Sequence, residues 1–343
     1  MELKTEKSRL AGILSNVWGY IKGNPIVILI AVVCIVVGCR VENFFSWRNF
    51  NNLASNTAIR FLIALGVSGC LIIKGTDLSA GRQVGLAACF AGVLLQRADY
   101  SGRMFANMPE MNMWVVLLIV VAIGAVIGLI NGLIVSLLNV PPFIATLGTQ
   151  TIVYGIALVF TNAQPIGGFQ TDYINFVNGV LFKSGNYPGL PYLLLIAVAF
   201  GIFFWFLYNK TTHGKYMYAI GGNENAAEVS GVNTKLTKTM IFVIAGMMYS
   251  VAGYLLGAKA GGASSALANG YELEAIAGCT IGGVSTTGGI GTVGGILVGV
   301  LVFELLKIVL QFLQVNPYYN YIVQGLVIVV AVALDIRKYV AKK

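Results

Sequence analysis

The chain has 343 residues, of which 57% are hydrophobic and 10% are charged, and its formal net charge is +9. An ordinary soluble domain is about 25% charged, so this chain has too few charges to cover a water-facing surface. The composition excludes a disordered chain, a disulfide-rich secreted scaffold and a nucleic-acid-binding domain, and it predicts an all-α polytopic membrane protein.

About ten apolar runs follow the basic N-terminal segment that holds Lys4, Lys7 and Arg9. A helix needs about 20 mostly apolar residues to cross a bilayer, and roughly 17–25 are tolerated. The runs lie near residues 25–39, 59–73, 82–96, 114–138, 143–161, 190–208, 239–258, 271–284, 289–313 and 319–335. The first, second, third and eighth runs are short, so we expect them to be tilted or partly re-entrant within a helical bundle. Eight spans is the alternative count.

The basic residues are distributed unequally between the two sides of the membrane. With the N-terminus inside, ten spans place fourteen Lys and Arg residues on the inner side and seven on the outer side. Loops on the cytoplasmic side carry an excess of Lys and Arg, so both termini are predicted in the cytoplasm. The outer positions are Arg40, Arg48, Arg60, Arg97, Arg103, Lys183 and Lys259.

Glycines recur at four-residue spacing within the spans. In lipid, helices associate through close packing of small residues, so these G-x-x-x-G patterns predict a tightly packed, Gly-rich bundle. An additional role, in which such seams let helices slide during transport, stays open. The patterns are Gly124–Gly128–Gly132, Gly253–Gly257–Gly261, Gly291–Gly295–Gly299, Gly81–Gly85 and Gly278–Gly282.

Motifs for a cofactor or a catalytic centre are missing from the sequence. The five cysteines are scattered through apolar stretches, His213 is the single histidine, and no G-x-x-x-x-G-K-[ST] sequence occurs. Metal sites need clustered Cys, His or carboxylate ligands, and a P-loop needs its glycine-rich sequence. We therefore expect no catalytic residue, bound cofactor or metal in this chain, and no enzymatic activity of its own.

Several polar residues lie in or beside apolar runs. Asp77, in Thr76-Asp77-Leu78-Ser79, is interpreted as a helix N-cap, with an intramembrane acid on a transport path as the alternative. Glu304 and Lys307 are three residues apart and are expected to pair with each other. Glu272 and Glu274 are interpreted as interfacial residues at the mouth of a span. The candidates for a pathway or gate are Asp77, Ser79, Asn131, Glu304 and Lys307.

The most polar stretch covers residues 214–238. An Asn-rich turn precedes Glu224–Val229, which is predicted to be a short helix, and Gly231 is predicted to end it. A helix that lies on a lipid surface has a large apolar face with Lys and Arg. This helix is small and rich in Ala and carries Glu224 and Glu228, so we expect it to dock into a groove on a partner protein.

At this helix the sequence begins to resemble a known family, and the resemblance runs from about residue 57 to the C-terminus. Residues 225–231 (N-A-A-x-x-x-G) resemble the coupling-helix signature of ABC importer permeases, although Asn225 stands where that signature usually has Glu. Further matching stretches are 75–86 (GTDLSAGRQVGL), 122–140, 142–149 (PFIATLGT), 219–223, 271–277 (YELEAIA), 283–295, 315–322 and 331–335. Together they resemble the ribose and branched-chain amino acid permease group, and within it the permeases for galactose and methyl galactoside.

The resemblance implies one transmembrane permease domain over residues 1–343, in the cytoplasmic (inner) membrane of a bacterium. It implies a homodimer, an external sugar-binding protein that delivers a hexose, and two ATPase subunits that use ATP and Mg²⁺. The ATPase subunits are expected to dock on residues 214–233, and the coupling residues are Gly222, Asn223, Glu224, Asn225, Ala226, Ala227, Glu228 and Gly231.

The rival interpretation is a secondary sugar transporter coupled to an ion gradient. Such a transporter would use an intramembrane acid, and Asp77 and Glu304 are the candidates for that role. Dependence of uptake on a separate ATPase would distinguish the two mechanisms.

Overall fold

The computed structural model describes residues 25–185, 187–316 and 318–340, and these are mostly helical. The helices are α2 (Pro25–Arg40), α3 (Trp47–Ile72), α4 (Ala80–Leu94), α5 (Met113–Leu137), α6 (Pro142–Thr161), α7 (Thr171–Asn178), α8 (Tyr192–Lys210), α9 (Thr212–Gly222), α10 (Glu224–Val229), α11 (Thr234–Ala260), α12 (Tyr271–Ile281), α13 (Val293–Phe312) and α14 (Tyr319–Val340). An antiparallel hairpin, β1 (Val180–Leu181) and β2 (Leu190–Pro191), connects α7 to α8. The basic residues Lys4, Lys7, Arg9, Lys22, Lys342 and Lys343 lie outside the described residues.

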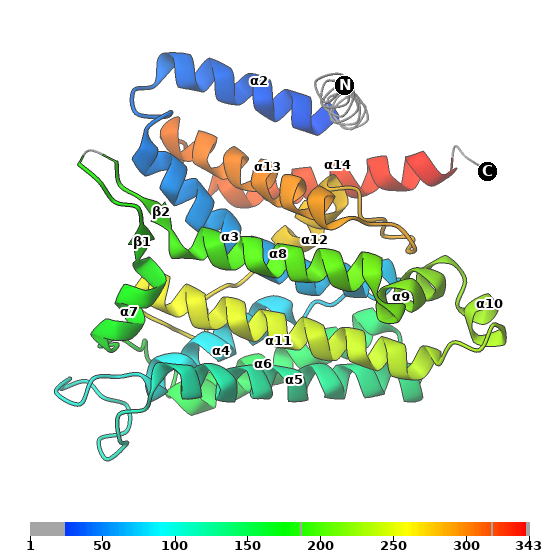
Figure 1. The fold of residues 1–343 in the computed structure, drawn as a ribbon, viewed down its shortest axis with the longest axis horizontal. Coiled ribbons are helices and arrows are strands. Elements are labelled where there is room, and N and C mark those ends of the chain that lie inside the picture. The colour runs from blue at the N-terminus through cyan, green and yellow to red at the C-terminus, as the bar shows by residue number, and fades with distance from the viewer. Residues whose placement is uncertain (1–24, 186, 317, 341–343) are drawn as a thin grey trace, which may run out of the picture.

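The long helices run side by side along the long axis of the molecule (Figure 1). Helices α9 and α10 lie at one end, which we call the α10 end, and α7 and the β1–β2 hairpin lie at the other, the hairpin end. Helix α2 begins and α14 finishes at the α10 end. The described chain therefore crosses the bundle an even number of times.

Each of the ten predicted spans coincides with one helix. Six helices (α3, α5, α6, α8, α11 and α13) are long and apolar enough to cross a membrane, and shorter apolar segments lie in α2, α4 and α14. Helix α4 has 15 residues and α12 has 11. At 1.5 Å per residue they reach about 22 Å and about 16 Å, less than the roughly 30 Å hydrocarbon core. The third and eighth runs are therefore short, as predicted.

The second run was expected to be short, and that prediction is wrong. Helix α3 has 26 residues and begins twelve residues before the apolar run, at a start capped by Ser46, whose hydroxyl accepts the Asn49 N–H at 3.2 Å. Along its most apolar 18 residues, α3 is 83% buried by the rest of the protein, whereas the figure for α5 and α8 is 22%. Protein therefore surrounds the apolar part of α3, whereas Trp47, Arg48 and Phe50 in its first turn are exposed.

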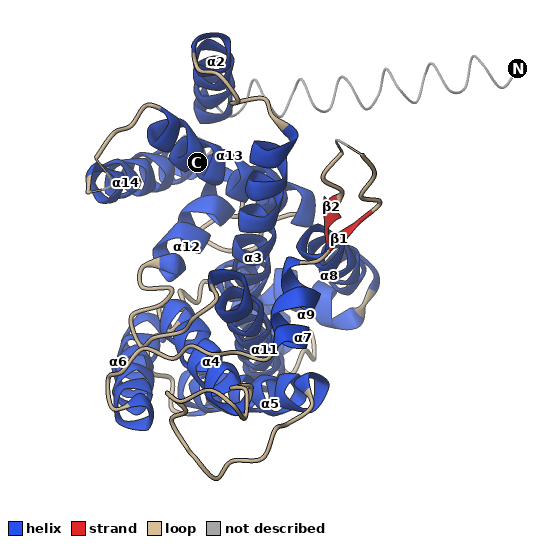
Figure 2. Cartoon of the chain, turned by 90° about the vertical axis from the view of Figure 1, so that its left-hand side faces the viewer, coloured by secondary structure: helices blue, strands red, loops and turns tan. Residues whose placement is uncertain are grey.

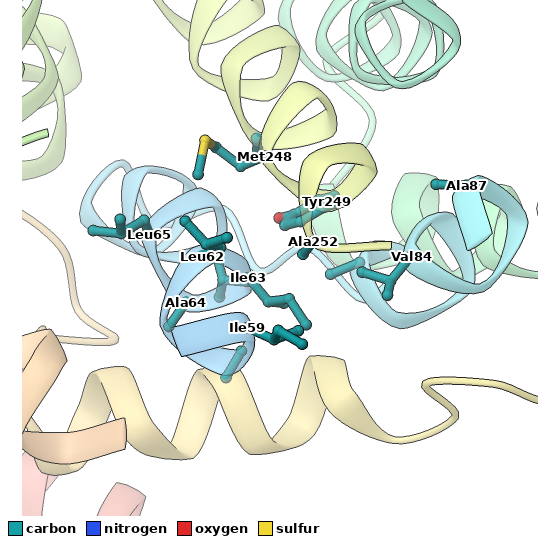
Figure 3. Close-up of a cluster of buried hydrophobic side chains, with 14 of the residues drawn as sticks. Ile59, Leu62, Ile63, Ala64, Leu65, Val84, Ala87, Met248, Tyr249 and Ala252 are labelled. Atoms are coloured by element: carbon teal, nitrogen blue, oxygen red, sulfur yellow. The ribbon is translucent and has the colours of Figure 1, made fainter. Parts of the chain in front are cut away.

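The centre of the bundle is formed by α3 and α11, with α4 beside them. Figure 3 shows Ile59, Leu62 and Ile63 of α3 close to Tyr249 of α11 and Val84 of α4. All five side chains are at most 2% exposed. Helices α5, α6 and α8 surround this centre and expose apolar side chains on their outer faces, as expected for helices that face lipid.

The predicted glycine seam of α5 packs directly on the backbone of α11. A Cβ atom at Gly128 would lie 2.2 Å from the carbonyl oxygen of Phe242, and one at Gly124 would lie 2.3 Å from that of Gly246. Gly246 faces Gly124 in return, at 2.1 Å. Only glycine permits so close an approach, and the packing role predicted for this pattern is confirmed.

The other predicted glycine patterns behave differently from one another. Between α12 and α13, a Cβ atom at Gly299 would lie 1.9 Å from the carbonyl oxygen of Gly278, and one at Gly295 would lie 2.1 Å from that of Gly282. The pattern in α11 is tight only at Gly253, which faces the Val84 carbonyl oxygen at 2.2 Å. Gly261 instead ends α11 with φ +67°, a conformation that favours glycine.

The two short helices are entered from opposite ends of the bundle (Figure 1). Residues 73–79 lead back from the α10 end into α4, and residues 261–270 lead inward from the hairpin end into α12. Both segments are non-helical and partly buried within the protein. Irregular backbone at membrane depth is tolerated where protein or a water-filled cavity surrounds it.

Candidate functional site

Residues 212–233 form an arm at the α10 end, built from α9, α10 and the turn into α11 (Figure 1). Asn223 begins α10 by accepting the Ala226 N–H at 3.1 Å. Gly231 follows the helix with φ +88°, and its N–H donates to the Glu228 carbonyl at 2.9 Å. The predicted helix over Glu224–Val229 and its glycine terminator are both confirmed, whereas α9 was not foreseen.

The exposed face of α10 differs from the face expected of a docking helix. Ala227 is 5% exposed and packs into the protein's own core, so it is not available to a partner, contrary to its expected place in the docking contact. Glu224 forms an ion pair at 2.5 Å with Lys238 of α11 within the same chain. The side chains left outward are those of Asn225, Ala226, Glu228 and Val229, and Val229 is 90% exposed.

The arm is fixed to the bundle mainly through α9. A Cβ atom at Gly221 would lie 1.9 Å from the Ile72 carbonyl oxygen at the end of α3, and the same oxygen accepts the Gly289 N–H at 2.8 Å. The Tyr218 hydroxyl donates to the Gly291 carbonyl at 2.7 Å. Burial raises the pKa of Tyr218 and lowers that of His213, so both side chains are neutral near pH 7. Movement of α9 therefore bears on both the segment before α4 and the segment after α12.

Three of the predicted pathway residues, Asp77, Ser79 and Asn131, meet in one buried network. The Ser79 N–H and hydroxyl both donate to Asp77 Oδ1, at 2.9 and 2.5 Å. The Tyr249 hydroxyl donates to Asp77 Oδ2 at 3.2 Å. Asp77 lies three residues before α4 and bonds the backbone two residues on, so it holds the turn that precedes the helix and is not the N-cap that was expected.

The same network reaches α4, α5 and α6. Asn131 Nδ2 and Gln83 Nε2 donate to the Ser79 hydroxyl at 3.1 and 2.8 Å, and the Thr149 hydroxyl donates to Asn131 Oδ1 at 2.6 Å. All six side chains of this Asp77 network (Asp77, Ser79, Gln83, Asn131, Thr149 and Tyr249) are at most 7% exposed. Most of their polar atoms form hydrogen bonds within the network, and these bonds hold the start of α4 in place.

The other two pathway candidates, Glu304 and Lys307, belong to a separate cluster of charges. Arg60 Nε lies 2.9 Å from Glu274 Oε2 and 3.1 Å from Glu304 Oε2. Lys307 Nζ lies 2.5 Å from Glu274 Oε1. We call Arg60, Glu274, Glu304 and Lys307 the Arg60 cluster. The expected pairing of Glu304 with Lys307 is wrong, because each side chain reaches a different helix.

The Arg60 cluster lies at the middle of the bundle. Arg60 is the fourteenth of the 26 residues of α3, and Glu304 is near the centre of α13. Glu274 is in the first turn of α12. Two cations and two carboxylates balance, and their side chains are 3–15% exposed. Charges at such depth are costly unless paired, so the cluster ties α12 to α3 and α13.

The sequence interpretation missed this cluster in two ways. Arg60 was assigned to the outer loops, and Glu272 and Glu274 were interpreted as interfacial, whereas Glu272 is 5% and Glu274 8% exposed inside the protein. The available signal was the presence of ionisable residues at the edges of apolar runs, since such residues within membrane segments generally face a bundle interior or cavity. The sequence pattern does not show which of these charges contact each other, because Arg60 and Glu274 are 214 residues apart.

Comparisons with known proteins agree with this architecture. Residues 49–332 match the family described as "Branched-chain amino acid transport system / permease component". The galactose/methyl galactoside import permease protein of Escherichia coli (strain K12) is 46% identical over 328 residues, which cover 94% of this chain and 97% of that protein. The ribose import permease protein of Bacillus subtilis (strain 168) is 35% identical over 308 residues, 90% of each chain. No solved structure matches the chain.

Proposed function

This chain belongs to the family of branched-chain amino acid transport system permease components, and from that premise we propose that it is the membrane permease subunit of an ATP-driven importer of galactose, glucose or methyl galactoside. The 46% identity to a galactose/methyl galactoside import permease over 94% of the chain carries this proposal. Identity to a ribose import permease is lower, at 35%. The permease forms the translocation pathway and has no ATP site of its own.

The complete importer would contain two copies of this permease, two ATPase subunits and an external sugar-binding protein. ATP and Mg²⁺ are used by the ATPase subunits. In this arrangement the α10 end and both termini face the cytoplasm of a bacterium. The hairpin end lies on the outer side of the inner membrane, where it receives the sugar-binding protein. The loop-charge bias supports that orientation.

The arm of residues 212–233 is the proposed coupling site. Its outward residues, Asn225, Ala226, Glu228 and Val229, offer a small patch with one strongly exposed apolar side chain. The close approach of Gly221 to Ile72, together with the Tyr218–Gly291 hydrogen bond, gives a firm connection between that patch and the bundle. A partner that pushes on α10 therefore moves α9 against the ends of the membrane helices.

Reconstitution into vesicles tests the proposal. Permease, ATPase and binding protein are incorporated so that ATP is enclosed with the ATPase, and uptake of radiolabelled galactose is followed. We expect uptake that requires ATP hydrolysis and persists when ionophores collapse proton and sodium gradients. The control is an ATPase variant that binds but does not hydrolyse ATP. Uptake driven by an ion gradient with this inactive ATPase would contradict the proposal and favour a secondary transporter.

A further inference from the structure

Arg82, in the first turn of α4, is a cation that the Asp77 network and the Arg60 cluster do not include. Its guanidinium lies over the ring of Tyr154 of α6, 4.1 Å from the ring centroid. Its Nη1 donates to the Ser265 carbonyl oxygen at 3.3 Å. Among the described residues, the guanidinium makes this one hydrogen bond. The side chain is half-exposed. Its remaining N–H groups are therefore available to a ligand.

The position of Tyr154 places this pair near the centre of the bilayer. Tyr154 is twelve residues from Pro142 and seven from Thr161, or about 18 Å and about 10 Å along α6 at 1.5 Å per residue. A charged side chain at that depth faces a bundle interior or a water-filled cavity, because exposure to lipid is costly. The half-exposed face of Arg82 therefore borders water or protein.

Helix α6 itself has two kinds of outward face. Gln150 and Tyr154, one turn apart, are half-exposed on the side of Arg82. Ile152 is 62% and Val159 81% exposed, and both are apolar, as suits contact with lipid. The polar side and the apolar side of one helix thus distinguish a wet face from a lipid face.

The first turn of α12 places a buried carboxylate beside the wet face. Glu272 is 5% exposed, and its Oε2 has no hydrogen-bond partner among the described residues. A Cβ atom at Gly81, beside Arg82, would lie 2.0 Å from that Oε2. Figure 2 shows α4, α6 and α12 gathered on the same side of the molecule. The starts of the two short helices therefore bring one cation and one carboxylate together.

We propose that Arg82, Tyr154 and Glu272 form a hexose-binding subsite midway along the translocation pathway; this inference rests on the proposed function. The free N–H groups of Arg82 donate to sugar hydroxyls, and Glu272 Oε2 accepts from them. Tyr154 holds the guanidinium flat through its ring face. One positive and one negative group leave the subsite without net charge, which suits a neutral polyol better than an anion. Few contacts also suit a pathway that must release its cargo.

Thiol labelling tests whether this face is wet and contacts sugar. Tyr154→Cys and Ile152→Cys are each made with Cys39→Ser, because Cys39 is exposed and the other four cysteines are buried. The variants are reconstituted with ATPase and binding protein and treated with a charged methanethiosulfonate reagent. We expect Tyr154→Cys to react at least tenfold faster than Ile152→Cys, and turnover with galactose to slow the reaction severalfold. Equal rates for the two variants, or no effect of galactose, would overturn the subsite.

Uptake by ring and charge variants gives an independent measurement. Ile152→Ala, on the lipid face of α6, should transport galactose within about twofold of the unaltered protein, whereas Tyr154→Ala and Arg82→Lys should lose roughly tenfold in maximal rate. Full transport by Tyr154→Ala and Arg82→Lys would overturn the inference. If the unaltered protein shows no ATP-dependent uptake, the proposed function fails; if it transports galactose but Tyr154→Cys remains unlabelled, only the subsite fails.

Discussion

The two short helices present the same structural problem and solve it with different chemistry. Each begins inside the protein after an irregular segment, α4 from the α10 end and α12 from the hairpin end. The start of α4 is fastened by hydrogen bonds among Asp77, Ser79 and Asn131. The start of α12 is fastened by charges, with Glu274 bound to Arg60 and Lys307. Loss of one group should therefore be more damaging at α12 than at α4.

Glu274→Gln is the change with the largest expected effect on stability. It leaves Lys307 without its carboxylate partner and Arg60 with only Glu304. Removing one partner of a buried ion pair typically costs about 3–5 kcal/mol, because the remaining charge stays buried without compensation. The free energy of unfolding in mixed micelles measures this loss.

The matched control is Asp172→Asn. Asp172 is exposed in the first turn of α7, and its carboxylate should contribute no more than about 1 kcal/mol there. A loss in the free energy of unfolding for Glu274→Gln as small as that of the control would show that these charges do not hold the start of α12 in place.

Gly128→Leu tests whether the close packing of α5 on α11, as well as hydrogen bonding, holds the start of α4 in place. A Leu side chain at this position must displace the backbone of Phe242, and it would draw the neighbouring Asn131 away from Ser79. Overpacking of this kind costs about 3 kcal/mol. Thermal denaturation of the purified permease and of a Gly148→Leu control would measure the difference.

Gly148 is exposed on α6, and a Cβ atom at this position would have no other atom within 4 Å, so its replacement should change stability by less than about 0.5 kcal/mol. Gly92 is intermediate, since a Cβ atom there would meet the Phe169 ring at 2.9 Å and a side chain moves more easily than a backbone. Equal losses at Gly128 and Gly148 would contradict the seam.

Asp77→Asn should cost less than Glu274→Gln, about 1–3 kcal/mol. The amide oxygen still accepts hydrogen bonds from Ser79. Among the described residues Asp77 is not ion-paired with a cation, so the substitution leaves no cation without its partner. Chemical unfolding of the two variants side by side ranks them. If Asp77→Asn proves the more damaging change, the hydrogen-bonded start of α4 is the stronger of the two fastenings, and the comparison is reversed.

How far the sequence predicts this molecule depends on the range of the interaction. The spans follow from the thickness of lipid, and the bounds of α10 follow from the local capping of Asn223 and Gly231, so both were accessible from short stretches. The Arg60–Glu274 pair joins residues 214 positions apart, and no local pattern carries that information. Ala227 illustrates the same limit at short range, because a helix of six residues does not reveal which face the bundle covers.

The arm at the α10 end is connected to both short helices, and its variants should affect stability least. Gly221 approaches Ile72, which precedes the segment leading into α4, and Tyr218 bonds Gly291, which follows α12. Ala226 is exposed on α10, so Ala226→Trp should alter the free energy of unfolding by less than about 0.5 kcal/mol. Ala227→Trp must force its ring into the core and should cost about 1–3 kcal/mol.

The effects of Ala226→Trp and Ala227→Trp on ATPase coupling should differ from their effects on stability. A bulky ring at Ala226 occupies the outward patch where the ATPase subunit is proposed to sit, so sugar-stimulated ATP hydrolysis and copurification of the ATPase should both fall although the permease remains folded. Ala227→Trp reaches the partner only by distorting α10, so its loss of coupling should accompany its loss of stability. Hydrolysis is measured in reconstituted vesicles, with Thr212→Trp, exposed at the start of α9, as the control. Full coupling in Ala226→Trp together with its loss in Thr212→Trp would place the ATPase on α9, from which Gly221 and Tyr218 reach the segments beside both short helices.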